Sequence, residues 1–370
     1  MRIGFDAKRL FHNQTGLGNY SRDLVRILHQ YYPENSYILF NPKPKKNPRF
    51  QLSSPQIIEI NPKGFWKNIK SLWRSWGMSL AFKKLPLDIY HGLSGELPIG
   101  IPSKVKKIVT IHDLIFLRHP EWYNALDVKI HHKKFAYACK KADIIIAISE
   151  QTKRDIVHFL KVPEHKIEVI YQGCHEIFKH SFSIEEKKEF AQIHQLPKQF
   201  LLYVGTIEPR KNALEIVKAI QGTDYHLVLV GKKTKYFEQI QAFVQQHQME
   251  HQLTVFWHLE LAQLSMLYQL ASIFIYPSHF EGFGIPILEA LFCQTPVITN
   301  QEGVFPEVGG PNSYYIDVKQ TNQLKRAIQH LMEHPELRDA MSIEGLRFAQ
   351  KFNDDVIAKN WMALYQKLLQ

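Results

Sequence analysis

The stretch that decides the fold reads EGFGIPILEA, residues 281–290. It follows residues 273–276, a short apolar run that ends at a proline and is typical of a buried parallel strand. Pro286 suits the first position of a helix, because its missing N–H would have no partner there. Amides at a helix start and the helix dipole favour an anion, and the two glycines let a ligand approach the backbone. The stretch therefore predicts a strand, a loop and a helix that together bind an anionic ligand.

Two glutamates flank the predicted helix start. Glu281 precedes the helix, and Glu289 lies about one turn inside it. Carboxylates accept hydrogen bonds from sugar hydroxyls, so the pair could hold two ends of one ligand. The plainer interpretation is a pair of solvated acids, which are favourable near any helix start. For an isolated pair that interpretation would prevail, and a second segment weakens it.

The second segment reads GTIEPRKN, residues 205–212. An apolar run at residues 200–204 leads into it, and a helix is predicted over residues 213–220. Arg210 and Lys211 therefore stand side by side where a strand passes into a helix. Arginine offers a planar fork for phosphate oxygens and lysine a compact charge, so the pair suits a diphosphate.

In their order and spacing, these motifs resemble the retaining glycosyltransferases of family 4, which have the GT-B fold. The likeness continues through PVI at residues 296–298 and PEV at residues 306–308. At the amino end, GFD at residues 4–6 and TGLGNY at residues 15–20 resemble that family's first strand and glycine-rich loop. With IHDL at residues 111–114, this opening is most similar to the branch that contains O-antigen mannosyltransferases. The resemblance spans nearly the whole chain.

The resemblance implies four catalytic residues, His112, Arg210, Lys211 and Glu281. Arg210, Lys211 and the amides at the helix start would stabilise a departing nucleoside diphosphate without a metal ion. Glu281 would bind a hydroxyl of the donor sugar, and His112 would touch the sugar beside its anomeric carbon. A lone histidine at a strand end is more often structural, but the adjoining Asp113 in a predicted cleft favours a functional role.

The donor-binding residues implied by the resemblance lie in four short stretches, with Glu289 expected to hold the ribose hydroxyls. They are Gly16, Leu17, Gly18, Gly205, Thr206, Gly282, Phe283, Gly284, Ile285, Pro286 and Glu289. The expected donor is GDP-mannose, on branch likeness. A UDP-hexose stays open, since FWHL at residues 256–259 stands where the family usually has a glycine.

The expected reaction transfers a hexose to a glycan or lipid-linked oligosaccharide acceptor in cell-surface polysaccharide assembly. The family retains the anomeric configuration, and we favour front-face attack in which the leaving phosphate accepts the acceptor's proton. Glu281 as a covalent nucleophile is the weaker option, since its expected partner is a hydroxyl. No cofactor and no metal are expected.

Short apolar strands alternate with helical patterns along the chain, which predicts an α/β fold with two Rossmann-like parallel-sheet domains and ligand at the strands' carboxyl ends. Residues 1–176 would form the acceptor-side domain and residues 177–353 the nucleotide-sugar domain. By resemblance, the last helix, residues 354–370, would pack back on the first domain. The predicted strands are residues 2–5, 37–40, 57–60, 89–92, 107–111, 144–147, 167–171, 200–204, 226–230, 253–256, 273–276 and 296–299.

Composition is consistent with a reduced, cytoplasmic protein. The chain has 370 residues and three cysteines, Cys139, Cys174 and Cys293, with no close pair that would indicate a disulfide framework or a zinc site. The first residues run directly into a strand, and the apolar runs are too short to span a bilayer. The expected location is the cytoplasm, with association at the inner face of the cell membrane left open.

The formal charge of +11 is concentrated in one segment. Residues 41–84 carry ten Lys or Arg and a single acid, Glu59. Within residues 63–84, here called the basic segment, apolar residues including Trp73 and Trp76 recur at helical spacing among Lys67, Lys70 and Arg74. Tryptophans beside basic residues suit an anionic membrane interface, whereas an inward apolar stripe would make the segment part of a core.

Two other classes of protein remain as alternatives. A UDP-sugar epimerase can share the fold, although the two glutamates with Arg210 and Lys211 fit transfer better. A basic nucleic-acid-binding protein would use the basic segment and would not need the glutamates, and its binding would be weak and nonspecific.

Overall fold

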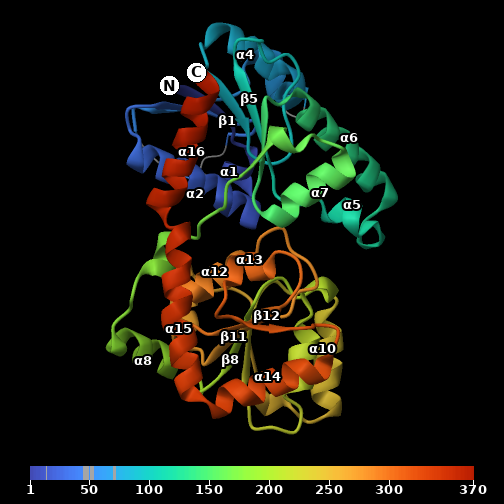
Figure 1. The fold of residues 1–370 in the computed structure, drawn as a ribbon, viewed down its shortest axis with the longest axis vertical. Coiled ribbons are helices and arrows are strands. Elements are labelled where there is room, and N and C mark those ends of the chain that lie inside the picture. The colour runs from blue at the N-terminus through green and yellow to red at the C-terminus, as the bar shows by residue number, and fades with distance from the viewer. Residues whose placement is uncertain (14, 45–49, 51–53, 70–71) are drawn as a thin grey trace. The chain divides into compact units, whose positions relative to one another are not determined.

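The computed structural model describes residues 1–13, 15–44, 50, 54–69 and 72–370, and these divide into two compact units (Figure 1). Unit 1 contains Met1–Gly173 and Phe352–Gln370, and unit 2 contains Cys174–Lys351. The boundaries expected after residues 176 and 353 lie within three residues of these. Each unit has its own sheet and its own hydrophobic core.

Unit 1 is built on a seven-stranded parallel sheet in the order β3-β2-β1-β4-β5-β6-β7. Side chains alternate between its two faces, as strand geometry requires. Ile3 and Phe5 of β1 join one core cluster, whereas Ile38 and Phe40 of β2 join the other. The strands are β1 (Arg2–Asp6), β2 (Ser36–Phe40), β3 (Ile57–Ile60), β4 (Ile89–Gly92), β5 (Lys106–Ile111), β6 (Ile144–Ala147) and β7 (Ile167–Val169).

Helices cover both faces of this sheet, which explains why most of its strand residues are apolar. Three of them, α1 (Lys8–His12), α2 (Gly16–Tyr31) and α16 (Asp354–Leu369), supply side chains to the cluster on one face. The opposite face is covered by α4 (Met78–Lys84), α5 (Ile115–Arg118), α6 (Ala125–Lys141) and α7 (Glu150–Leu160).

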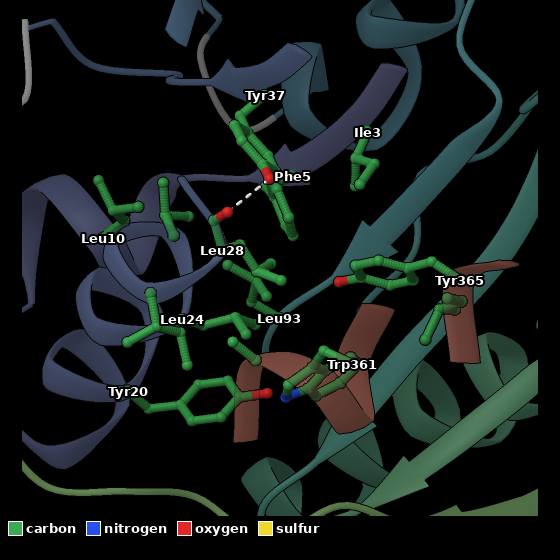
Figure 2. Close-up of a cluster of buried hydrophobic side chains, with 14 of the residues drawn as sticks. Ile3, Phe5, Leu10, Tyr20, Leu24, Leu28, Tyr37, Leu93, Trp361 and Tyr365 are labelled. Carbon is green, nitrogen blue, oxygen red and sulfur yellow. Dashed lines mark hydrogen bonds between the residues drawn. The ribbon is translucent and has the colours of Figure 1, made fainter. Parts of the chain in front are cut away.

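The last helix, α16, packs on unit 1 beside α2. Trp361 and Tyr365 are fully buried in the same cluster as Phe5 and Tyr37, as Figure 2 shows. The Tyr37 hydroxyl donates to the Leu28 carbonyl oxygen at 2.7 Å in this cluster. The helix therefore completes the core of unit 1, although it follows the whole of unit 2 in sequence.

Unit 2 has a six-stranded parallel sheet in the order β10-β9-β8-β11-β12-β13. Its strands are β8 (Leu201–Val204), β9 (Leu227–Val230), β10 (Leu253–Phe256), β11 (Ile273–Tyr276), β12 (Val297–Asn300) and β13 (Tyr314–Ile316). Its helices are α8 (Ile184–Ile193), α9 (Ala213–Ala219), α10 (Phe237–Gln246), α11 (Leu261–Leu270), α12 (Ile285–Phe292), α13 (Phe305–Gly309), α14 (Thr321–Glu333) and α15 (Pro335–Ala349).

The strand order shows where each sheet can bind a ligand. In unit 2 the chain moves outward from β8 through β9 to β10, and then returns to the other side of β8 as β11. Connections on opposite faces leave a crevice at such a reversal, beyond the carboxyl ends of β8 and β11. Unit 1 has the same reversal between β1 and β4.

Two elements differ from the sequence-based expectations. The strand β13, only three residues long, was not predicted because a half-buried YYI run has too little pattern to recognise. The basic segment is also not one amphipathic helix. It forms a 3₁₀ turn at Gly64–Lys67, a π-helical turn at Trp73–Gly77 and then α4, while Lys70 and Ser71 lie outside the described residues.

Candidate active site

The sequence motifs of unit 2 meet at the crevice between β8 and β11. A 3₁₀ turn at Pro209–Lys211 follows β8 and carries Arg210 and Lys211. The loop after β11 is joined to this turn, because the His279 amide donates to the Arg210 carbonyl oxygen at 2.9 Å. Arg210 in turn donates through Nη1 to the Phe280 carbonyl oxygen at 2.5 Å. These two hydrogen bonds therefore hold the two loops together.

Glu281 lies in the second of these two loops, and four groups contact its Oε1 atom. Arg210 Nη1 is 2.9 Å away and Lys211 Nζ 3.2 Å away. The hydroxyls of Tyr276 and Ser278 donate to the same oxygen at 2.8 and 3.0 Å. Burial alone would raise the pKa of Glu281, but Lys211 and Arg210 outweigh it and lower that pKa to about 2. Glu281 is therefore an anion at neutral pH.

A second carboxylate, Glu208, binds the other side of Arg210. Glu208 Oε1 accepts from Arg210 Nη2 at 2.7 Å. Burial lowers the pKa of Arg210, but Glu281 and Glu208 raise it by more, so the guanidinium stays charged. Sequence analysis did not identify Glu208, Tyr276 or Ser278 as site residues. The sequence marks these three residues only by their position, since each lies within five residues of a predicted site residue.

The helix α12 begins at the predicted place with one difference in register. Gly284 is its N-cap with φ 112°, a left-handed conformation that favours glycine, and Pro286 is its second residue and not its first. The Ile287 amide donates to the Gly284 carbonyl oxygen at 2.9 Å, and Pro286 has no N–H. The amides of Gly284 and Ile285 are therefore the ones at this helix start that can face an anion.

Glu289 lies in the second turn of α12 and has a partner of its own. Tyr268, which is fully buried on α11, donates to Glu289 Oε2 at 3.0 Å. Glu281 and Glu289 therefore have different partners and separate positions.

Gly205 and Thr206 connect β8 to the turn that carries Arg210. The Tyr203 hydroxyl donates to the Thr206 carbonyl oxygen at 3.0 Å.

Unit 1 contains a pocket of about 250 Å³ near the carboxyl ends of β4 and β5. Carboxylates and aromatic rings share its wall, a combination suited to the hydroxyls and the apolar faces of a sugar. The lining residues are Arg9, Leu17, Ser94, Glu96, His112, Asp113, Phe116, Tyr123, His131 and Phe135.

His112 lines this pocket as a neutral imidazole. Its Nε2 lies 2.8 Å from the Leu93 carbonyl oxygen, which can only accept, so Nε2 carries the proton. Burial lowers the pKa of His112 to about 4, which leaves Nδ1 as a hydrogen-bond acceptor at neutral pH. The ring of Tyr20 packs edge-on against His112 with centroids 4.6 Å apart. This geometry suits His112 to accept a hydrogen bond from a ligand hydroxyl.

Residues 16–18, expected as a glycine-rich loop, form the first turn of α2. A Cβ atom on Gly18 would lie 2.1 Å from the Asn13 carbonyl oxygen, so the close approach requires glycine. The Gly18 amide donates to Asn13 Oδ1 at 3.2 Å and is already used. Leu17 lines the pocket. Of the three expected donor amides, those of Gly16 and Leu17 lack an intrahelical acceptor.

Arg74, expected as one of the exposed cations of the basic segment, points inward. Its Nε atom is 2.8 Å from Asp6 Oδ2, and its Nη1 atom is 2.5 Å from Glu96 Oε2. Asp6 ends β1 and is buried, and Glu96 lines the pocket. Burial lowers the pKa of Arg74, but Asp6 and Glu96 raise it by more. A buried arginine fork is held this way because two carboxylates compensate its charge.

Cys139, Cys174 and Cys293 are free and buried. In the described part of the chain, no helix combines the length and apolar character needed to cross a bilayer. Within the same ranges, no group of three or more His, Cys, Asp or Glu side chains is placed to hold a metal ion.

Two parallel sheets, one with a crevice and one with a pocket near its strand ends, are the architecture of the GT-B fold of glycosyltransferases. Sucrose-phosphate synthase from Thermosynechococcus elongatus has the same fold, with a TM-score of 0.81 and 20% identity over 100% of this chain and 99% of that one. The family model described as Glycosyltransferase Family 4 matches residues 15–176, and that described as Glycosyl transferases group 1 matches residues 184–347, so that the two together span most of the chain. The chain therefore belongs to glycosyltransferase family 4.

Curated relatives include mannosyltransferases of O-antigen synthesis. The O-antigen chain mannosyltransferase B of Escherichia coli is 27% identical over 379 aligned positions, which cover 95% of this chain and 96% of that protein. The O-antigen chain mannosyltransferase RfbU of Salmonella typhimurium is 26% identical over 303 positions, covering 80% and 78%. The protein is therefore a glycosyltransferase, and this membership favours transfer over the epimerase and nucleic-acid interpretations.

Proposed function

We propose that the protein transfers mannose from GDP-mannose to a glycan or lipid-linked acceptor in cell-surface polysaccharide assembly, with retention of the anomeric configuration and without a metal ion. The observation that carries the proposal is the cluster of Arg210, Lys211 and Glu281 at the crevice of unit 2. Two cations and a helix start at one strand end suit a diphosphate, and an ionised glutamate beside them suits a sugar hydroxyl.

The charges of the cluster indicate how a diphosphate would enter. Arg210 and Lys211 are balanced by Glu208 and Glu281, so a diphosphate has to replace one carboxylate. Glu281 is 13% exposed and is held by Tyr276 and Ser278, whereas Glu208 is 34% exposed. Glu208 is therefore the carboxylate that leaves. The freed Arg210 fork and Lys211 would then stabilise the charge that develops on the leaving diphosphate.

Glu281 suits binding better than nucleophilic attack. Its Oε1 atom accepts from four groups, and a carboxylate so strongly stabilised is a weak nucleophile. Glu281 would bind a hydroxyl of the donor sugar, and Glu289 would hold the ribose. We accordingly favour front-face attack, in which the acceptor's proton passes to the leaving phosphate. His112, as a neutral acceptor, would contact a sugar hydroxyl in its pocket.

A UDP-hexose is the alternative donor because of Trp257. This residue follows β10, is 42% exposed and packs edge-on against Phe237 with centroids 4.7 Å apart. Lys233 Nζ lies 5.7 Å from its ring centroid. An exposed indole near the strand ends could select a nucleobase by stacking, and its size does not distinguish guanine from uracil.

Docking of the basic segment to anionic bilayers is also part of the proposal. Trp73 is 4% exposed and packs in the core with Met78 and Phe82, whereas Trp76 is 61% exposed. Leu72, Trp76 and Leu80, spaced four residues apart, are all exposed. One face of the basic segment therefore packs in the core, as Trp73 does. The other face, with Leu72, Trp76 and Leu80, is the one that would contact a membrane.

The docking experiment has to avoid Arg74, which is ion-paired inside unit 1. Exchanging Trp76 for serine should weaken co-sedimentation with phosphatidylglycerol vesicles, because the exposed indole is lost without disturbing the core. Vesicle binding equal to that of the unchanged protein would contradict docking through this segment.

Thermal stabilisation by nucleotides tests the donor. GDP and GDP-mannose should raise the melting temperature, by the equivalent of about 3 kcal/mol at a hundredfold excess over the dissociation constant, and the effect should persist in EDTA. Stabilisation by UDP and UDP-glucose instead would favour the alternative donor. A requirement for divalent ions would contradict metal independence, and no stabilisation by any sugar nucleotide would contradict the proposed function.

A further inference from the structure

The wall of the unit 1 pocket contains an arginine, Arg9. It lies on α1, which follows β1, and its side chain is half-buried. Of the lining residues, all of which the structure describes, Arg9 is the one with a permanent positive charge. Among the described residues, its guanidinium has no ion pair and no hydrogen bond. A half-buried charge of this kind is costly unless a ligand compensates it.

The acids beside Arg9 are already occupied by other groups. Both oxygens of Glu96 contact cations, since Oε2 lies 2.5 Å from Arg74 Nη1 and Oε1 lies 3.5 Å from Lys134 Nζ. Asp6 Oδ2 accepts from Arg74 Nε at 2.8 Å, and Asp6 Oδ1 accepts from a backbone amide at 3.2 Å. These two carboxylates are therefore held in place away from Arg9, and they stabilise Arg74 instead.

The positive charge of Arg9 acts on the basic groups around it. The pKa of Lys8 is lowered, chiefly by burial and further by Arg74 and Arg9. Burial is also the main cause of the low pKa of His112, and Arg9 adds to it. The charge of Arg9 therefore reaches the part of the pocket that His112 lines, and an anion bound there would be attracted to it.

The other lining groups suit the neutral parts of a sugar. His112 accepts a hydroxyl proton through Nδ1, and the Ser94 hydroxyl can donate or accept. The rings of Phe116 and Phe135 offer apolar surface to the face of a sugar ring. A volume of about 250 Å³ is near the lower end for ligand pockets, which suits a single sugar unit.

A carboxylate fits Arg9 better than a phosphate does. A guanidinium donates two parallel hydrogen bonds to a carboxylate, and the single charges of the two groups match. A phosphate monoester carries nearly two negative charges at neutral pH. Its second charge would face the carboxylates of Glu96 and Asp113, which share the same wall.

We propose that the pocket of unit 1 binds an acceptor sugar that carries a carboxylate, and that Arg9 recognises this carboxylate. The inference rests on the proposed function and narrows its acceptor to an acidic glycan that ends in a uronic acid. Arg9 binds the carboxylate, while His112 and Ser94 bind hydroxyls of the same sugar. A neutral sugar would leave the guanidinium without a partner, so Arg9 determines specificity for acidic over neutral acceptors.

Binding of two matched glycosides to the full chain tests the role of Arg9. Methyl glucuronide and methyl glucoside differ only at carbon 5, which carries a carboxylate in the first and a hydroxymethyl group in the second. In titrations followed by ligand-detected NMR, the unchanged protein should bind methyl glucuronide about tenfold more tightly, as expected for a charge-assisted hydrogen bond.

Three variants separate the contribution of Arg9 from that of charge in general. Arg9→Gln should bind the two glycosides equally, and Arg9→Lys, which keeps the charge without the planar fork, should retain part of the preference. The matched control is Arg347→Gln, because Arg347 is 73% exposed and pairs with Glu344 on its own helix in unit 2. The control should keep the whole preference.

Equal binding of both glycosides by the unchanged protein would overturn the acidic acceptor, and tighter binding of glucose 6-phosphate than of methyl glucuronide would overturn the carboxylate. A full preference in Arg9→Gln or in Arg9→Lys, or an equal loss in Arg347→Gln, would overturn the role of Arg9. Stabilisation by GDP tests the donor site proposed for unit 2. Its absence from the unchanged protein would count against the proposed function and not against Arg9.

Discussion

Exchange of Arg210 for alanine should lower the turnover of sugar transfer by about a hundredfold to a thousandfold, the usual effect of removing one preorganised donor to a developing anion. The side chain contributes an ion pair of 2.9 Å to Glu281 and a hydrogen bond of 2.7 Å to Glu208. It also donates to the Phe280 carbonyl oxygen, so the variant loses part of the connection between the two loops. Most of the effect should appear in kcat, because the charge that Arg210 stabilises develops during reaction.

The same substitution should make the protein more sensitive to acid. The pKa of Glu281 is lowered from 4.5 to about 2, which corresponds to about 3 kcal/mol of stability. A lowered carboxylate pKa contributes this stability above pH 4.5, and the contribution is lost as pH falls toward 2. Because Lys211 would be the one remaining cation of the pair that contacts Glu281, the variant should keep only part of this stability and should unfold in acid at a higher pH.

The measurements are steady-state release of nucleotide from the sugar donor and acid unfolding followed by circular dichroism. Arg347→Ala is the matched control, because Arg347 is 73% exposed and pairs with Glu344 on its own helix. The control should change neither quantity. A folded Arg210→Ala variant with turnover near that of the unchanged protein would refute the role assigned to the cluster.

Three further predictions concern single residues. Glu208→Gln should tighten GDP binding several-fold at low salt, because a neutral side chain no longer competes for Arg210, and the gain should shrink as salt screens the charges; calorimetry showing unchanged affinity would contradict this. Gly18→Ala should lower the free energy of unfolding by about 1–3 kcal/mol, since its Cβ would lie 2.1 Å from the Asn13 carbonyl oxygen, and equal stability in urea would argue against that contact. His112→Ala should reduce the rate without altering the shape of the pH profile between about pH 6 and 8, because the pKa of His112 is near 4; a limb that disappears with His112 would show that it titrates there.

The sheets were predictable because parallel strands buried on both faces are continuous apolar runs. Residues 57–60, 89–92, 144–147, 253–256 and 273–276 are strands with the predicted bounds. The last helix, predicted as residues 354–370, ends one residue beyond the observed α16. These elements could be predicted from the local sequence, because the residues that define each of them lie within a few positions of one another.

Contacts between distant residues were not predictable in the same way. Arg74 stands among exposed residues in a basic run, yet its fork reaches Asp6 and Glu96, which lie 68 and 22 residues away. Glu208 has no pattern that marks it as the partner of Arg210. In the basic segment, the helical spacing did not produce one regular helix, and the burial of Trp73 beside exposed Trp76 depends on how the segment packs on the rest of unit 1. Such facts arise from packing and not from propensity.

A crystal structure of the protein with GDP-mannose would test the central claim most directly. We expect the diphosphate oxygens about 3 Å from the Arg210 guanidinium and the Lys211 ammonium, with Glu208 turned away and Glu281 on a mannose hydroxyl. A diphosphate bound elsewhere, with Glu208 still paired to Arg210, would contradict the account.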